Sequence, residues 1–237
     1  MSASSARSSA STDISNETQA RAAARPAGRA SIHEVNFVVA ASEAFSQANQ
    51  RAPIAETMRE IETMLPEAAA AGMRTTVTVS VAFGCPYEGE VAVSDVVPLV
   101  ERSIAAGADE IALGDTIGVA SPGDVVSQID ALADVLATTP LRCHFHDTRN
   151  TGIANVVAAV EAGVSVVDAS VGGAGGCPYA PNATGNVPTE DVIYTLHRMG
   201  YDTGVDIEAM IATGHWLAAK LGKQLPSALG RAGPWPT

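Results

Sequence analysis

Short hydrophobic runs alternate with longer amphipathic stretches along the chain from residue 34 onward. The short runs are rich in Val, Ile and Thr, which favours strands, and the stretches between them carry apolar residues at helical spacing. The predicted strands span residues 35–40, 75–81, 110–114, 141–146 and 164–170. Glycines near the ends of the intervening stretches (Gly72, Gly107 and Gly163) indicate where helices stop.

Two helix starts can be located from local residue order. Ser121 followed by Pro122 and Asp124 predicts an N-cap, a proline in the first turn and an acidic residue that favours the helix dipole. Thr189 with the two acids after it predicts a second start of the same kind, and Gly200 predicts its end.

Strands that alternate with helices predict a parallel sheet built from βα units. The fold class is therefore α/β, with five predicted strands in 237 residues. The regular pattern defines one domain over residues 34–225, preceded by a disordered or non-homologous leader at 1–33 and followed by a tail at 226–237.

Charge and composition exclude several classes of function. The formal net charge is −12, which disfavours non-specific binding to nucleic acid or to an anionic membrane. Three cysteines (Cys85, Cys143 and Cys177) without a CxxC spacing indicate reduced thiols in a cytoplasmic protein. The Ser-, Ala- and Arg-rich residues 1–30 fit a transit peptide, a disordered leader or a misplaced start.

Two histidines separated by one residue form the sharpest candidate site. In the segment LRCHFHDT, alternation along a strand places Arg142, His144 and His146 on one face. Imidazoles at this spacing can bind one ion together, and they lie at the carboxyl end of their strand, where βα barrels carry their chemistry. The alternative is two ordinary histidines. Asn186, which precedes a predicted helix, could add an oxygen ligand that suits Mg²⁺ or Mn²⁺.

Two loops add further candidates. Asp115 and Thr116 follow a predicted strand end, where they could serve a site or simply cap a turn. The segment VGGAGGCPYAP places four glycines directly before Cys177, which fits a hinge, a phosphate cradle or a loop that delivers a reactive thiol. Its Gly-Cys-Pro-Tyr sequence repeats that of residues 84–87, so both copies are predicted on the same rim of the sheet.

Taken in order, FGCPYEG, LGDTIG, HFHDT, DASVGGAGGCPYAPNATGN and TED resemble the 3-hydroxy-3-methylglutaryl-CoA lyase family of metal-dependent TIM-barrel lyases, from about residue 34 to about residue 225. The resemblance implies a fold of the (β/α)8 TIM-barrel type. It implies retro-aldol cleavage of an acyl-CoA substrate, 3-hydroxy-3-methylglutaryl-CoA, to acetyl-CoA and acetoacetate with Mg²⁺ or Mn²⁺. It implies metal ligands at His144, His146 and Asn186, and catalytic residues at Cys177 and Asp115. It also implies substrate contacts from Ser42 and Thr116.

The resemblance also shows what this chain lacks. The family's first strand carries an Arg-Asp-Gly motif, and no Arg-Asp dipeptide occurs here. A full barrel of this type needs eight strands and typically about 250 residues, so the five strands predicted here imply an incomplete barrel over residues 34–225. Five strands leave two open sheet edges, which predicts poor solubility or a homo-oligomer. A truncated gene, a fragment or a wrong start is the expected explanation. The remaining alternatives are a non-catalytic remnant that associates with a full-length homologue, and a related synthase or lyase for another acyl-CoA or 2-oxo acid.

Overall fold

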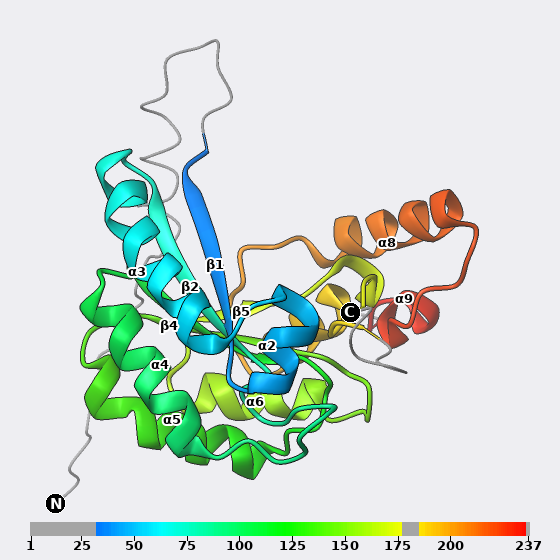
Figure 1. Ribbon diagram of the computed structural model, residues 1–237. Helices are drawn as coiled ribbons and strands as arrows, with labels where there is room; N and C mark the ends of the chain where they lie inside the picture. Colours follow the sequence, from blue (N-terminus) through cyan, green and yellow to red (C-terminus); the bar gives the residue numbers. More distant parts are fainter. Residues whose placement is uncertain (1–31, 177–184, 236–237) are drawn as a thin grey trace, which may run out of the picture. The chain divides into compact units, whose positions relative to one another are not determined.

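The computed structural model describes residues 32–176 and 185–235, in which five strands form one parallel sheet (Figure 1). The strands are β1 (Glu34–Ala40), β2 (Arg74–Ser80), β3 (Glu110–Asp115), β4 (Leu141–Phe145) and β5 (Val166–Asp168). They pair in chain order, so each strand lies beside the next one along the sequence. Parallel neighbours need a crossover, and helices provide it here.

Helices connect the strands and then complete the chain. Those between strands are α2 (Glu43–Gln50), α3 (Ile54–Ala70), α4 (Val93–Ala105), α5 (Pro122–Leu136) and α6 (Gly152–Glu161). After β5 come η1 (Val171–Gly173), α7 (Thr189–Arg198), α8 (Ile207–Leu221) and α9 (Ala228–Ala232). Helix α3 packs on β1 and β2, α4 on β2 and β3, and α6 on β4. None of the helices in the described ranges is long and apolar enough to span a membrane.

The two faces of the sheet differ in chemistry. On β4, Leu141, Cys143 and Phe145 are buried in the core under the helices, while Arg142 and His144 are only partly buried on the opposite face. The predicted alternation of this strand is therefore confirmed. The helix-covered face carries the main apolar core, and the other face presents polar side chains from neighbouring strands.

One predicted helix start is confirmed in detail and the other only in position. The Ser121 hydroxyl accepts from the Asp124 amide, and the Asp124 carboxylate accepts from the Ser121 amide, so a capping box opens α5. Helix α7 begins at Thr189 as predicted, but Thr189 is not an N-cap. Pro188 occupies that position and supplies no side-chain hydrogen bond.

All five predicted strands are present, with ends that differ by a few residues. The prediction of 164–170 for the last strand was too long, because beyond Asp168 the chain turns to a different partner. The Ser170 amide donates to Val187 O at 3.1 Å, and the Thr189 amide donates to Ser170 O at 2.8 Å. At Ser170 the residues just before α7 thus take the place of a neighbouring strand as hydrogen-bond partners.

The sheet is an incomplete barrel of five parallel strands, as the sequence predicted. Among the described residues, β1 and β5 each pair on one side only. The sheet nevertheless curls. Its curvature is shown by the contact of Arg142 on β4 with Glu34 on β1, across two intervening strands, with 3.3 Å between Nη2 and Oε1. The curvature makes the polar face concave, as in the interior of a barrel.

Burial should make Cys143 chemically inert. Desolvation, followed by the charge of Asp168, raises the pKa of the Cys143 thiol to about 12. We expect alkylation of Cys143 by iodoacetamide at pH 8 to be on the order of 10³-fold slower in the native protein than in the denatured protein, because only the thiolate reacts. Peptide mass spectrometry after timed quenching measures this ratio. Equal rates in the two states would contradict it.

Candidate active site

His144, on β4, and His146, the residue directly after β4, lie together at the carboxyl end of the strand. The strand register sets His144 beside Gly114 of β3 and beside Asp168 of β5. The ring centroids of His144 and His146 are 5.3 Å apart. The structure therefore brings both imidazoles to one place, as the alternation along β4 predicted.

His146 is the more buried of the pair and has a free ring nitrogen. Its residue is 5% exposed, and Nδ1 has no hydrogen-bond partner among the described residues. Desolvation by burial, together with the nearby His144, lowers the pKa of His146 to about 4. At neutral pH the ring is thus uncharged and keeps a lone pair, which is the form that binds a metal ion.

Asn186 reaches the histidines because its segment pairs with the end of β4. His146 and Asn186 form an isolated antiparallel bridge, and the Val187 amide donates to Phe145 O at 3.2 Å. The Asn186 side chain hydrogen-bonds His146 and also donates from Nδ2 to Ala174 O at 3.1 Å. One carboxamide therefore stands beside two imidazoles.

The side chains of His144, His146 and Asn186 fit part of the coordination shell of a divalent cation. Among residues 32–176 and 185–235, no group of three or more His, Cys, Asp or Glu side chains is placed to hold an ion. The free buried Nδ1 of His146 and the amide of Asn186 fit nitrogen and oxygen ligation by Mg²⁺ or Mn²⁺. His144, His146 and Asn186 would supply three ligands, and an octahedral ion would need more from water, substrate or other protein groups.

Asp168 orients His144 from the next strand. Its Oδ2 lies 3.6 Å from His144 Nδ1, and its Oδ1 accepts from Arg142 Nη1 at 3.1 Å. Burial raises the pKa of Asp168, but the contact with His144 and the charge of Arg142 outweigh burial and leave the pKa lowered. The carboxylate therefore stays charged and faces Nδ1, which leaves Nε2 of His144 for a ligand.

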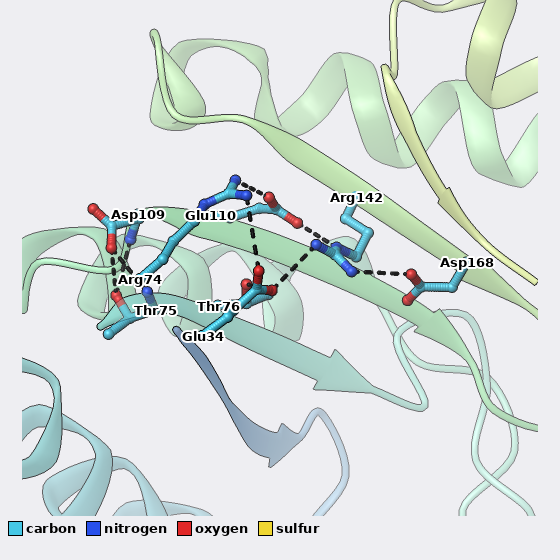
Figure 2. Close-up of polar contacts among 8 residues, drawn as sticks. All are labelled: Glu34, Arg74, Thr75, Thr76, Asp109, Glu110, Arg142 and Asp168. Carbon is cyan, nitrogen blue, oxygen red and sulfur yellow. Dashed lines mark hydrogen bonds and ion pairs between the residues drawn. The ribbon is translucent and has the colours of Figure 1, made fainter. Parts of the chain in front are cut away.

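A fully buried carboxylate lies on the polar face at the start of β3, the middle strand of the sheet (Figure 2). The Glu110 side chain is 0% exposed and forms ion pairs with Arg74 from β2 and Arg142 from β4. Arg142 continues the chain of charges to Asp168. Because two cations flank Glu110, their attraction offsets the cost of removing its charge from water.

Asp115 and Thr116 lie at the end of β3 but serve the local backbone. The Asp115 carboxylate, which is 1% exposed, accepts from the amides of Val119 and Ala120 at 2.9 and 3.2 Å. Burial raises the pKa of Asp115, and these hydrogen bonds counteract part of the rise. The Thr116 hydroxyl accepts from the Val81 amide at 2.9 Å. The structure thus gives both side chains structural partners, and their predicted site roles stay predictions.

Ser42 follows β1 at the same end of the sheet. It is the N-cap of α2 and accepts from the Phe45 amide at 3.2 Å. Its hydroxyl also donates to Glu88 and contacts Cys85 Sγ at 2.9 Å. Ser42 therefore links β1 to the first Gly-Cys-Pro-Tyr loop, and its contact with substrate stays a prediction.

The glycine segment after β5 is anchored before it reaches Cys177, which itself lies outside the described residues. The Gly172 amide donates to both carboxylate oxygens of the buried Glu190, at 3.0 and 2.8 Å. Further along, a Cβ on Gly175 would lie 2.7 Å from Asn186 Nδ2, so glycine there allows Asn186 to approach. Residues 172–175 thus lie beside Asn186 and are held in place by hydrogen bonds to Glu190.

Comparison with known proteins matches this geometry to one family. The HMGL-like family model matches residues 5–216. The chain belongs to the HMGL-like family. An HMGL-like relative from Pseudomonas mevalonii, hydroxymethylglutaryl-CoA lyase, is 44% identical over 206 residues, which cover 87% of this chain and 68% of that protein. The (R)-citramalyl-CoA lyase of Chloroflexus aurantiacus is 38% identical and covers 88% of this chain.

Solved structures of the HMGL-like family agree with the fold. An HMG-CoA lyase from Acinetobacter baumannii in complex with coenzyme A and 3-methylmalate matches with a TM-score of 0.81 at 36% identity, over 86% of this chain and 68% of that one. The Bacillus subtilis HMG-CoA lyase gives a TM-score of 0.79 at 38% identity. The chain spans 66% of the length of curated relatives such as the Chloroflexus enzyme.

Sequence reasoning missed the residues that support the site. Arg142 was placed on the histidine face, but its partners Glu110 and Asp168 were not recognised. The available signal was their position: each points to the polar face from a neighbouring predicted strand. The missing information was the register, since only the pairing of β3, β4 and β5 puts the three side chains together.

Removing the central charge should destabilise the fold. Glu110→Gln keeps the side-chain size but leaves Arg74 and Arg142 without their buried anion, so we expect the free energy of unfolding to fall by about 3 kcal/mol. Urea denaturation measures it. Glu62→Gln is the control, because both side chains of the Glu62–Arg102 pair are partly exposed and its loss should cost less than about 1 kcal/mol. Similar losses in the two variants would contradict the central role of Glu110.

Proposed function

We propose that this chain forms the histidine- and cysteine-bearing part of a divalent-metal-dependent carbon–carbon lyase. The proposed reaction cleaves 3-hydroxy-3-methylglutaryl-CoA to acetyl-CoA and acetoacetate. The observation that carries the proposal is the convergence of His144, His146 and Asn186 at the end of β4 in a chain of the HMGL-like family. Residues 34–225 are the proposed catalytic region.

His144, His146 and Asn186 are the proposed metal ligands. A bound Mg²⁺ or Mn²⁺ would stabilise the negative charge that develops on the substrate oxygens during cleavage. The Asp168 carboxylate lies beside Nδ1 of His144, so Nε2 would be the nitrogen that holds the ion. Burial keeps His146 neutral, and the bridge to Asn186 brings the carboxamide to the same place. These contacts support the proposal that the three donors are arranged before substrate binds.

Cys177 and Asp115 are the proposed catalytic residues. A retro-aldol cleavage removes the hydroxyl proton of the substrate and returns a proton to the acetyl-CoA enolate. We assign the second transfer to Cys177, which follows the glycine segment that Glu190 anchors. Asp115, with its raised pKa, is assigned to proton transfer or to positioning of the loop that it holds at Val119 and Ala120. We assign Ser42 and Thr116 to contacts with the substrate.

A second candidate substrate is citramalyl-CoA. It is favoured by the 38% identity to the (R)-citramalyl-CoA lyase of Chloroflexus aurantiacus over 208 residues. The two substrates undergo the same bond cleavage and share acetyl-CoA as a product. They differ in the keto acid, which is acetoacetate from 3-hydroxy-3-methylglutaryl-CoA and pyruvate from citramalyl-CoA.

The ligand assignment is tested by metal binding. His144→Ala and His146→Ala each remove one imidazole, and we expect each to weaken Mn²⁺ binding by about 10- to 100-fold in isothermal titration calorimetry. His197→Ala is the control, because His197 is an exposed residue of α7 whose ring hydrogen-bonds Thr203, and its loss should leave Mn²⁺ affinity unchanged. Unchanged affinity in both site variants would refute the assignment.

The reaction is tested with the full chain and added Mg²⁺ or Mn²⁺. We expect acetyl-CoA and acetoacetate in equal amounts from 3-hydroxy-3-methylglutaryl-CoA, and loss of turnover in Cys177→Ser, because a hydroxyl is a far weaker acid than a thiol. Product formation is followed by liquid chromatography. Pyruvate from citramalyl-CoA alone would transfer the proposal to the second substrate, and no cleavage of either thioester would overturn the lyase proposal.

A further inference from the structure

The chain after β3 folds around the carboxylate of Asp115. Residues 116–120, the Asp115 loop, join the end of β3 to the cap of α5. The Asp115 carboxylate accepts from the amides of Val119 and Ala120 at 2.9 and 3.2 Å. The Asp115 carbonyl accepts from the Gly118 amide at 3.1 Å. Because these donors are amides of the loop itself, the path of the loop sets the position of the carboxylate.

The Asp115 loop lies directly against the segment that follows β4. Gly118 has φ 62°, and a Cβ on it would lie 2.9 Å from His146 O and from the side chain of Thr148. Glycine at this position therefore lets the loop approach the backbone of a proposed metal ligand. Further along the loop, Ala120 O accepts from Asn155 Nδ2 of α6 at 2.8 Å. The two segments are thus close enough for one to position the other.

Arg149 joins the two segments. Its Nη1 donates to Ile117 O at 2.8 Å and to Gly118 O at 3.0 Å. One guanidinium nitrogen thus bridges two consecutive carbonyls of the Asp115 loop from a residue that follows His146 closely along the chain. Hydrogen bonds from a charged donor are stronger than those between neutral groups. Arg149 is therefore a charged link between the loop and the segment after β4.

A turn after β4 presents the Arg149 side chain to the loop. The Asn150 amide donates to Asp147 O at 3.2 Å, and Asn150 has φ 57°. Asparagine adopts this left-handed conformation more readily than most residues. The Asp147 carboxylate accepts from the Gly152 amide at 2.9 Å, where α6 begins. Hydrogen bonds on both sides of Arg149 therefore fix the place from which it reaches the Asp115 loop.

Arg149 also acts on Asp115 through its charge. Burial raises the pKa of Asp115, and the charge of Arg149 is one of the effects that lower it again. Arg149 is itself an exposed residue, so its replacement takes nothing out of the core. A variant of Arg149 should therefore lose the link to the loop and keep the fold.

We propose that Arg149 is a positioning residue for the lyase reaction, which holds the Asp115 loop against the segment after β4 and so keeps the Asp115 carboxylate in place. The inference rests on the proposed function, because Asp115 is a proposed catalytic residue. Arg149 acts through the loop carbonyls that it binds. The register supports this role, since Asp115 of β3 lies beside Phe145 of β4, the residue directly before His146.

Amide hydrogen–deuterium exchange of the full chain, followed by NMR, tests the link directly. We expect Arg149→Gln to speed exchange of the Val119 and Ala120 amides by at least about fivefold, because the loop opens more often without its link. The urea midpoint should stay that of the wild type, since Arg149 is exposed. Arg198→Gln is the matched control, because Arg198 is an exposed arginine in the last turn of α7 and its replacement should leave both amides unchanged.

Turnover tests the catalytic consequence. The substrate is 3-hydroxy-3-methylglutaryl-CoA, or citramalyl-CoA if the wild type cleaves only that thioester. We expect Arg149→Gln to lower kcat by about tenfold and to change KM and Mn²⁺ affinity by less than about twofold, because a displaced catalytic group slows the chemical step without removing a binding contact. In an Asp115→Asn background, Arg149→Gln should lower kcat by less than about twofold further, since Arg149 acts through Asp115.

The inference is overturned by wild-type exchange at Val119 and Ala120 in Arg149→Gln, or by an equal loss of kcat from Arg149→Gln with and without Asp115. Failure of the lyase proposal is distinct. Exchange that depends on Arg149 in a protein that cleaves neither thioester would support the link to the Asp115 loop and reject the reaction. Turnover that is insensitive to Arg149→Gln would support the reaction and reject Arg149 as a positioning residue.

Discussion

The parallel pairing of β4 between β3 and β5 is the constraint on which the site depends. Register places Gly114, His144 and Asp168 in one row across three strands. A shift of one residue would turn His144 into the core and Cys143 onto the polar face, because successive side chains alternate. The apolar residues Leu141, Cys143 and Phe145 prevent that shift, since each is buried under the helices. The packing of one face thus fixes the chemistry of the other.

The polar face of the sheet is stabilised by ion pairs around a buried carboxylate. Glu110 is fully buried, and such a carboxylate is tolerated only with close cations and hydrogen bonds. Arg142 meets that need and also holds Asp168, which faces His144. A residue that stabilises the sheet therefore also orients a candidate ligand. Arg142 therefore contributes both to the stability of the sheet and to the position of Asp168 beside His144.

The sequence was informative where the signal was local. The alternation along β4 predicted the two faces, and Ser121 with Pro122 and Asp124 predicted the start of α5. Prediction was weaker where a distant segment decides the structure. The last strand was predicted too long because Val187, almost twenty residues later, takes over the hydrogen bond at Ser170. The partners of Glu110 were missed for the same reason, since they come from other strands.

The central claim is that His144 and His146 bind one divalent ion together. Pulsed electron paramagnetic resonance of the protein with bound Mn²⁺, prepared with ¹⁵N-labelled histidine, tests it most directly. The account predicts hyperfine coupling from two imidazole nitrogens, reduced to one when either His144 or His146 is replaced by alanine. Bound Mn²⁺ without coupling to any histidine nitrogen would contradict it.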